Sequence, residues 1–109
     1  MDDNNTTAAP DLALYMFHGC VYCHRVMRAL DALGVEVELR NIRDHAKHRR
    51  ALQTARGRTT VPVLRIQGAE GQEDRWMPES ADIIRYLAQR FNNGTVPRRG
   101  LLQRVLSWF

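Results

Sequence analysis

An apolar run that leads directly into a helical pattern most strongly restricts how this chain can fold. Residues 12–17 (LALYMF) have the length and composition of a buried β-strand. The next two residues interrupt the run. Apolar residues then recur at helical spacing from Val21 to Gly34, a residue type that commonly ends helices. The sequence therefore predicts a strand followed at once by a helix, with residues 18–20 as the connection.

The rest of the chain alternates in the same way between strand and helix patterns. Further strands are predicted at 35–39, 61–66 and 75–77, and further helices at 46–56, 80–91 and, as a short amphipathic helix, 101–109. The first βαβ unit requires a right-handed crossover between parallel strands, and a hairpin turn at 68–71 adds an antiparallel edge. We therefore predict an α/β fold. It is a four-stranded mixed sheet flanked by helices in the order β-α-β-α-β-β-α, plus a short C-terminal helix.

The length of 109 residues, 44% of them hydrophobic, suits one domain with a core of its own. Residues 1–10 are polar and small, and we expect a flexible N-terminal tail there. They lack the basic start and apolar run of a secretory signal, and no stretch approaches the ~18 apolar residues that span a bilayer. We expect a domain at 11–91, a linker and short helix at 92–109, a cytoplasmic location and no membrane partner.

Basic residues, mostly arginines, give the chain a formal net charge of +4. They gather in two stretches, 43–58 and 98–109. Such a field favours anionic ligands, including small dicarboxylates and acidic protein surfaces, although a solvated helix face is an equally valid interpretation. Neither stretch interleaves aromatic residues with its charges, as a base-stacking surface does, so we expect no nucleic-acid partner.

Two cysteines, Cys20 and Cys23, lie where the first helix is predicted to begin. A disulfide between them would close too short a loop to stabilise the fold much, so the pair points to chemistry. The backbone N–H groups and dipole at a helix N-terminus favour a thiolate, the form that attacks disulfides. The i, i+3 spacing brings both sulfurs to one helix face. We expect Cys20 to be the nucleophile, and Cys23, deeper and with a higher pKa, to resolve the mixed disulfide.

Metal binding is the main alternative for a C-x-x-C pair. A structural zinc site needs four ligands, and the chain has no second cysteine pair. Residues 20–24 also spell the C-x-x-C-H haem-attachment pattern, but that attachment follows export, and no export signal is visible. We therefore expect no metal, and His24 is interpreted as an ordinary, partly exposed helix residue.

A proline at the head of the third predicted strand forms a second element of interest. Pro62 lies in the sequence Thr60-Val61-Pro62-Val63. A cis bond there would expose the preceding backbone N–H and C=O to a bound peptide. A plain edge-strand proline explains this tetrapeptide equally well.

Taken together, these features resemble the glutaredoxins and the glutaredoxin-like N-terminal domain of glutathione transferases. The resemblance covers about residues 11–91. It rests on the order of three motifs: Tyr22 inside the C-x-x-C, Thr60-Val61-Pro62, and Pro78-Glu79-Ser80 before the last helix of the domain. It implies a thioredoxin-like fold. It also implies a glutathione-dependent thiol–disulfide oxidoreductase that reduces protein or mixed disulfides.

The resemblance further implies a set of glutathione-binding residues: Tyr22, Val61, Pro62, Glu79, Ser80 and Arg58. Pro62 would be cis, and the backbone of Val61 would pair with the cysteinyl part of the tripeptide. Glu79 and Ser80 would hold the γ-glutamyl end. As an N-cap, Ser80 would place the ligand's carboxylate at a helix N-terminus, although it could also be a cap and nothing more. Any of the arginines at 43–58 could take the glycyl carboxylate; Arg56 and Arg58 lie nearest the Thr-Val-Pro turn, and Arg58 is included in the set.

The chain departs from the glutaredoxin pattern at three positions. Val21 stands where dithiol glutaredoxins have proline, which should leave the helix start looser. Phe17 replaces a common lysine, so one source of thiolate stabilisation is missing. The usual Gly-Gly before the last helix is replaced by the transferase-like Glu79-Ser80.

These departures leave other functions open. The first is a dimeric carrier of a glutathione-ligated iron–sulfur cluster, which Val21 permits. The second is an interaction module with a vestigial site, against which the intact cysteine pair counts. The third is glutathione conjugation, for which the large helical domain of transferases is not evident in this chain. We expect a monomer whose partners are glutathione, as co-substrate, and disulfide-containing proteins.

Overall fold

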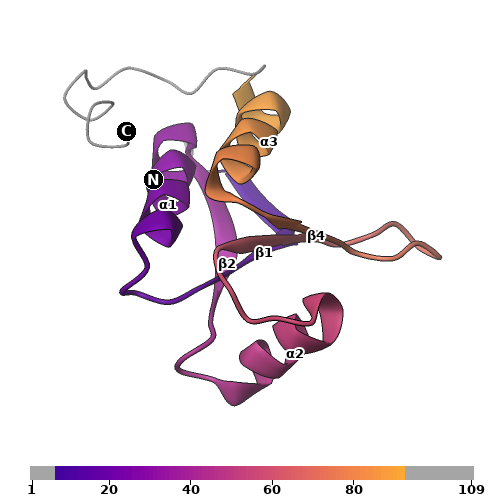
Figure 1. Cartoon of the computed structure of the whole chain (residues 1–109). Coiled ribbons are helices and arrows are strands. Elements are labelled where there is room, and N and C mark those ends of the chain that lie inside the picture. Colours follow the sequence, from indigo (N-terminus) through magenta and orange to yellow (C-terminus); the bar gives the residue numbers. More distant parts are fainter. Residues whose placement is uncertain (1–6, 93–109) are drawn as a thin grey trace.

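The computed structural model describes residues 7–92. It contains β1 (Thr7–Met16), α1 (Val21–Leu33), β2 (Val35–Asn41), α2 (Ala46–Arg56), β3 (Val63–Ile66), β4 (Arg75–Pro78) and α3 (Ser80–Asn92). The strands form one sheet in the order β2-β1-β3-β4, in which β1 and β2 are parallel and the other two pairs antiparallel. In Figure 1, α1 and α3 cover one face of the sheet and α2 covers the other. The predicted α/β, thioredoxin-like layout is confirmed.

The central strand β1 supplies both halves of the core, because successive side chains of a strand point to opposite faces. Towards α1 and α3, the core contains Leu12, Leu14 and Met16 of β1 with Val26, Leu30, Ile83 and Leu87 of the helices. Towards α2, it contains Ala13 and Tyr15 of β1 with Ile42, Leu52 and Val63. The run at 12–17 is therefore apolar throughout because both of its faces are covered.

β1 begins five residues earlier than predicted, so residues 7–10, which we assigned to the tail, belong to the sheet. Thr7 donates its backbone N–H to the carbonyl of Gly34 at 2.7 Å and pairs with Val35 of β2. The pairing with β2 shifts register between Ala8 and Ala13. Pro10, which has no N–H to donate, lies inside this irregular stretch. Most side chains of 7–10 are exposed, which is why the apolar pattern did not reveal the strand.

Other element boundaries also differ from the prediction: β4 and α3 each end one residue later, and β2 and β3 differ by two residues. β2 continues to Asn41, whose side-chain Oδ1 accepts the backbone N–H groups of Arg43 at 2.8 Å and Asp44 at 3.1 Å. This Asx turn leads the chain into α2. β3 begins at Val63 rather than at residue 61, since Val61 lies in a bend and Pro62 has no N–H to donate to a neighbouring strand. The predicted stop at Gly34 is confirmed, with a left-handed φ of 71° that favours glycine.

The predicted linker and amphipathic helix in 93–109 lie outside the described residues. Among the helices at 7–92, none is both long enough and apolar enough to cross a membrane.

A bidentate ion pair joins the last turn of α3 to the central strand. Arg90 Nη1 and Nη2 donate to the two carboxylate oxygens of Asp11 at 2.9 and 3.0 Å. The hydrogen bond from Arg90 lowers the pKa of Asp11 below its ordinary value of 3.8, although partial burial opposes this. Both side chains are about one-third exposed, at 34% and 36%, so solvent screens the pair.

Asp11→Asn is expected to lower the free energy of unfolding by about 0.5 kcal/mol at neutral pH. Because folding lowers the pKa of Asp11, the contribution is fully present above the ordinary pKa of 3.8 and is lost as the pH falls through the folded-state pKa. Urea denaturation of wild type and variant at neutral and strongly acidic pH measures the difference. A difference that persisted unchanged in acid would show that the ion pair is not its cause.

Candidate active site

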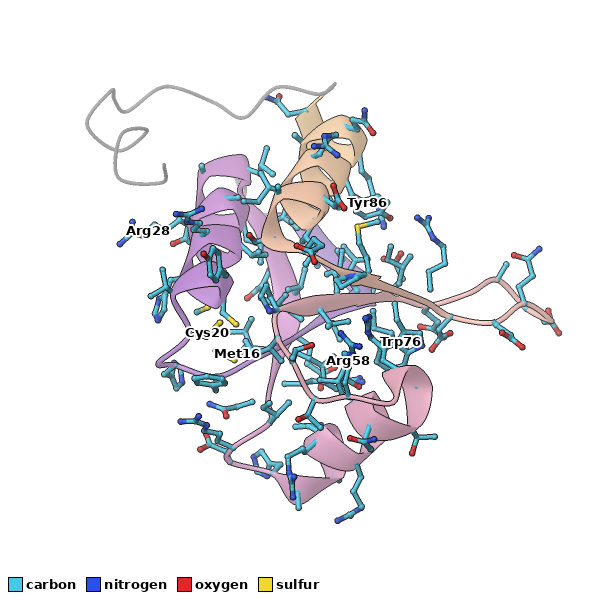
Figure 2. All side chains as sticks on the ribbon, viewed as in Figure 1. Met16, Cys20, Arg28, Arg58, Trp76 and Tyr86 are labelled. Atoms are coloured by element: carbon cyan, nitrogen blue, oxygen red, sulfur yellow. The ribbon has the colours of Figure 1, made fainter. Side chains whose placement is uncertain are left out.

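Three connections between elements meet at one end of the sheet. Tyr15 near the end of β1 pairs with Val63 at the start of β3, and Val63 pairs with Pro78 at the end of β4. The segments that follow β1, precede β3 and follow β4 therefore lie together. They carry the predicted site residues Cys20, Val61, Pro62, Glu79 and Ser80. Figure 2 shows Cys20 at the start of α1.

Cys20 occupies the N-cap position of α1, as predicted. Its backbone is extended (φ −90°, ψ 114°), and its Sγ accepts the backbone N–H of Cys23 at 3.1 Å. Its carbonyl accepts the N–H of His24 at 3.1 Å, the first hydrogen bond of the helix. The Cys20 sulfur therefore lies at the N-terminal end of the helix dipole with a backbone N–H directed at it.

Cys23 lies one turn deeper, with 0% of its surface exposed against 9% for Cys20. Burial is the main cause that raises the pKa of the Cys23 thiol, to about 12, and the hydrogen bond with Cys20 raises it further. A hydrogen bond from the backbone at Phe17 acts in the opposite direction. Both cysteines are free thiols in the structure. Cys23 is therefore protonated at neutral pH. Its sulfur is also more deeply buried than that of Cys20.

The peptide bond between Val61 and Pro62 is cis, as the resemblance implied. The carbonyl oxygen of Val61 lies 3.9 Å from the Sγ of Cys20, a distance at which a thiol makes a weak hydrogen bond. The backbone before Pro62 therefore borders the cysteine sulfur.

The start of α3 differs from the prediction. The helix begins at Ser80, and the carbonyl of Glu79 accepts the N–H of Ile83 at 3.0 Å. Glu79 therefore holds the N-cap position, and the prediction that Ser80 caps the helix is wrong. The reason is the backbone of Glu79, which has a φ of 74° and turns the chain one residue earlier. This left-handed region costs a non-glycine residue about 1–2 kcal/mol and is enriched at functional sites.

The two remaining predicted site residues lie towards solvent. Tyr22 is 56% exposed on the first turn of α1, beside Val21, which is 66% exposed. Arg58 is exposed between the end of α2 and the cis-proline turn. Within the part of the chain that the structure describes, no hydrogen bond or ion pair joins Arg58 to Cys20 or Glu79.

Sequence reasoning missed two contacts that hold the turn before Cys20. The guanidinium carbon of Arg43 lies 3.8 Å from the ring centroid of Phe17, so a cation stands beside the position where the glutaredoxin lysine is missing. His24 Nε2 lies 2.6 Å from the carbonyl oxygen of His18 and ties α1 to the turn. Nothing in the sequence around residues 41–44 indicated that Arg43 would lie over the Phe17 ring.

Metal ligation has no structural counterpart in this region. Across residues 7–92, no group of three or more His, Cys, Asp or Glu side chains is arranged to hold a metal ion. The chemistry that the arrangement supports is that of the two sulfurs and of a ligand held against the surrounding backbone.

Comparisons with known proteins place this arrangement in a family. Residues 14–95 match the family described as the glutathione S-transferase N-terminal domain. No curated protein matches the sequence. Three solved structures illustrate the relationship, and each is much longer than this chain.

One is a trimeric Leishmania glutathione transferase, TDR1, with 26% identity and a TM-score of 0.62 over 76% of this chain and 18% of its own. Glutathione transferase Omega 2S from Trametes versicolor is similar at 21% identity, with a TM-score of 0.64 over 87% of this chain and 42% of its own. The third is maleylacetoacetate isomerase from Anaeromyxobacter dehalogenans with glutathione bound in its active site. It has 23% identity and a TM-score of 0.58, over 86% of this chain and 44% of its own.

The latter two comparisons show the shared fold, and in all three cases this chain spans less than half the length of the other protein. The family match covers most of the residues that the structure describes, including both cysteines, the cis-proline turn and the Glu79 turn. This chain belongs to the glutathione S-transferase N-terminal domain family, whose fold is thioredoxin-like.

Proposed function

We propose that this protein binds glutathione and reduces mixed disulfides and protein disulfides, with Cys20 as the nucleophile and Cys23 as the resolving thiol. The difference between the two sulfurs is the observation that carries the proposal. Cys20 Sγ accepts a backbone N–H at the start of α1. Cys23 is fully buried, and burial raises its pKa. This difference supports attack by the Cys20 sulfur first, while the Cys23 sulfur remains a thiol until the second step.

The reaction begins when the Cys20 thiolate attacks the glutathione sulfur of a protein–glutathione disulfide. The bond between the two substrate sulfurs breaks, and the protein thiolate leaves and takes up a proton. Cys20 is then joined to glutathione through a disulfide. A glutathione thiolate can attack the glutathione sulfur of this intermediate, which produces glutathione disulfide and restores the Cys20 thiolate.

Cys23 offers a second way to resolve the same intermediate. Its thiol gives its proton to the departing glutathione thiolate and attacks the Cys20 sulfur, which forms the Cys20–Cys23 disulfide and releases glutathione. Two further glutathione molecules reduce that disulfide, become glutathione disulfide, and return both cysteines to thiols. The sulfur of Cys20 already contacts the Cys23 N–H at 3.1 Å, so the two residues lie close enough for this exchange.

Glutathione is proposed to lie across the end of the sheet. The backbone of Val61, before cis-Pro62, would pair with its cysteinyl part. The γ-glutamyl end carries an ammonium and a carboxylate. The Glu79 carboxylate would attract the ammonium, and Ser80 with the free N–H groups of the first turn of α3 would bind the carboxylate. Tyr22 would border the ligand, and Arg58 would take its glycyl carboxylate.

Glu79→Gly separates this binding role from a structural one. Glycine adopts a φ of 74° without strain, so we expect the free energy of unfolding to stay equal or to rise by up to about 1 kcal/mol. Loss of the carboxylate is expected to weaken glutathione binding about tenfold or more, as for a hydrogen bond to a charged group. Isothermal titration calorimetry and urea denaturation measure the two effects.

Glu70→Gly is the matched control. Glu70 is an exposed acid in the connection between β3 and β4, which projects away from the helices in Figure 1. Its replacement is expected to leave glutathione binding unchanged. Equal affinities for wild type and Glu79→Gly would remove Glu79 from the proposed site.

Transfer of glutathione to an electrophile is a second candidate, because the matching family is named for transferases. The same Cys20 environment and the same glutathione site would serve either reaction. The two candidates differ in the co-substrate, which is a disulfide in one case and an electrophilic carbon in the other.

A parallel assay decides between them. Turnover of a glutathione mixed disulfide is measured by coupling glutathione disulfide formation to glutathione reductase, and conjugation is measured with a chromogenic aromatic electrophile. We expect disulfide turnover well above the uncatalysed rate and little conjugation. Conjugation without disulfide turnover would favour the transferase reaction and contradict the proposed one.

A further inference from the structure

Two arginine–aromatic pairs lie on either side of Cys20 along the chain. The guanidinium carbon of Arg43 lies 3.8 Å from the Phe17 ring centroid, and that of Arg25 lies 5.1 Å from the Tyr22 ring centroid. Phe17 belongs to the turn that ends at Cys20, because its carbonyl accepts the Cys20 N–H at 3.2 Å. The guanidinium groups of Arg43 and Arg25 therefore lie over rings of the two segments that come directly before and after Cys20.

The Arg43 pair is held in place from several directions. The Asx turn at Asn41 fixes the backbone of Arg43 through a 2.8 Å hydrogen bond. The Phe17 ring is partly buried against both halves of the core. The ring also lies close to Gly19, where an added Cβ would lie 3.5 Å from a ring carbon. The backbone of Arg43 and the Phe17 ring are thus held in place, while Arg43 itself is exposed and accessible to a ligand.

Among residues 7–92, no carboxylate pairs with either of these two arginines. Elsewhere in residues 7–92, carboxylates pair with Arg40, Arg65, Arg85 and Arg90. No ion pair within that range involves Arg25 or Arg43. When a guanidinium stacks on a ring through its flat face, its N–H groups stay free at the edge to bind a carboxylate.

Resting on the proposed function, we infer that Arg43 and Arg25 make the enzyme select disulfides on acidic protein segments. Carboxylates on either side of a glutathionylated cysteine would meet the two guanidinium edges while its sulfur reaches Cys20. The exposed side chains of Val21 and Tyr22 offer apolar contact beside the sulfur. Charges at the rim of an interface act mainly on encounter rate and specificity, so the selection should appear in kcat/KM.

Three glutathionylated peptides test this inference. They share one sequence around a single cysteine, except that the flanking residues are aspartate and glutamate, asparagine and glutamine, or lysine. We expect wild-type kcat/KM for the acidic peptide to exceed that for the neutral peptide about fivefold at low salt, as for an exposed ion pair. The preference is expected to shrink as the salt concentration rises.

Arg43→Ala and Arg25→Ala are each expected to reduce the acidic-to-neutral ratio of kcat/KM, and the double variant to bring it close to one. Arg85→Ala is the control, because Arg85 is an exposed arginine on α3 that pairs with Asp82. It is expected to keep the wild-type ratio. Equal wild-type kcat/KM for all three peptides would overturn the inference but not the proposed function. Absence of turnover with every peptide would overturn the proposed function itself.

Discussion

Cys20→Ser is expected to reduce turnover of glutathione mixed disulfides by more than about a thousandfold, because a serine hydroxyl does not attack a disulfide at neutral pH. Serine is close to cysteine in size, and its oxygen can accept the Cys23 N–H that the sulfur accepts at 3.1 Å. The helix start should therefore remain intact. The glutathione-reductase-coupled rate measures the loss, and circular dichroism checks the fold.

Cys23→Ser is the matched variant for this prediction. It is expected to keep activity within about tenfold of wild type, because glutathione can resolve the intermediate on Cys20 without a second cysteine. If Cys20→Ser stayed active while Cys23→Ser was inactive, the roles assigned to the two sulfurs would be reversed.

Leu14→Ala is expected to lower the free energy of unfolding by about 2–5 kcal/mol, a large part of the stability of a small domain. Leu14 has no exposed surface and lies on the central strand, where it pairs with Leu64 of β3 and Leu39 of β2. A cavity at this point cannot close easily, because strands hold it on both sides. Urea denaturation followed by circular dichroism measures the change.

Leu39→Ala makes the same chemical change on the outer strand β2, where 45% of the side chain is exposed. It is expected to cost less than about 1 kcal/mol, because little apolar area leaves water there on folding. Equal losses for the two variants would contradict the placement of β1 at the centre of the sheet.

The sequence predicted the elements whose signals are local and periodic. The apolar run at 12–17 marked the central strand because both faces of that strand are covered. Gly34 marked the end of the first helix, and it has the left-handed backbone that such an end favours. The strand–helix junction placed Cys20 at an N-cap and Cys23 one turn deeper, and the structure shows this asymmetry in exposure.

Other features depend on contacts between distant parts of the chain, and no local pattern indicated them. Serine is a favoured N-cap residue, so the sequence pointed to Ser80 as the cap of the last helix. The positive φ of Glu79 is not one that glutamate favours, and no local pattern indicated it. The first residues of β1 are small and mostly exposed, and they enter the sheet because β2 lies beside them. Arg43 lies over Phe17, 26 positions away in sequence, because the pairing of β2 with β1 brings the ends of the two strands together.

The proposed reaction depends on Cys20 attacking the disulfide and Cys23 resolving the intermediate. Intact-mass spectrometry under anaerobic conditions tests these two roles most directly. Reduced wild type, Cys20→Ser and Cys23→Ser are each mixed with glutathione disulfide and quenched in acid. We expect Cys23→Ser to carry one glutathione, Cys20→Ser to carry none, and wild type to lose two hydrogens as its internal disulfide forms. A glutathione adduct on Cys20→Ser, with none on Cys23→Ser, would contradict the account.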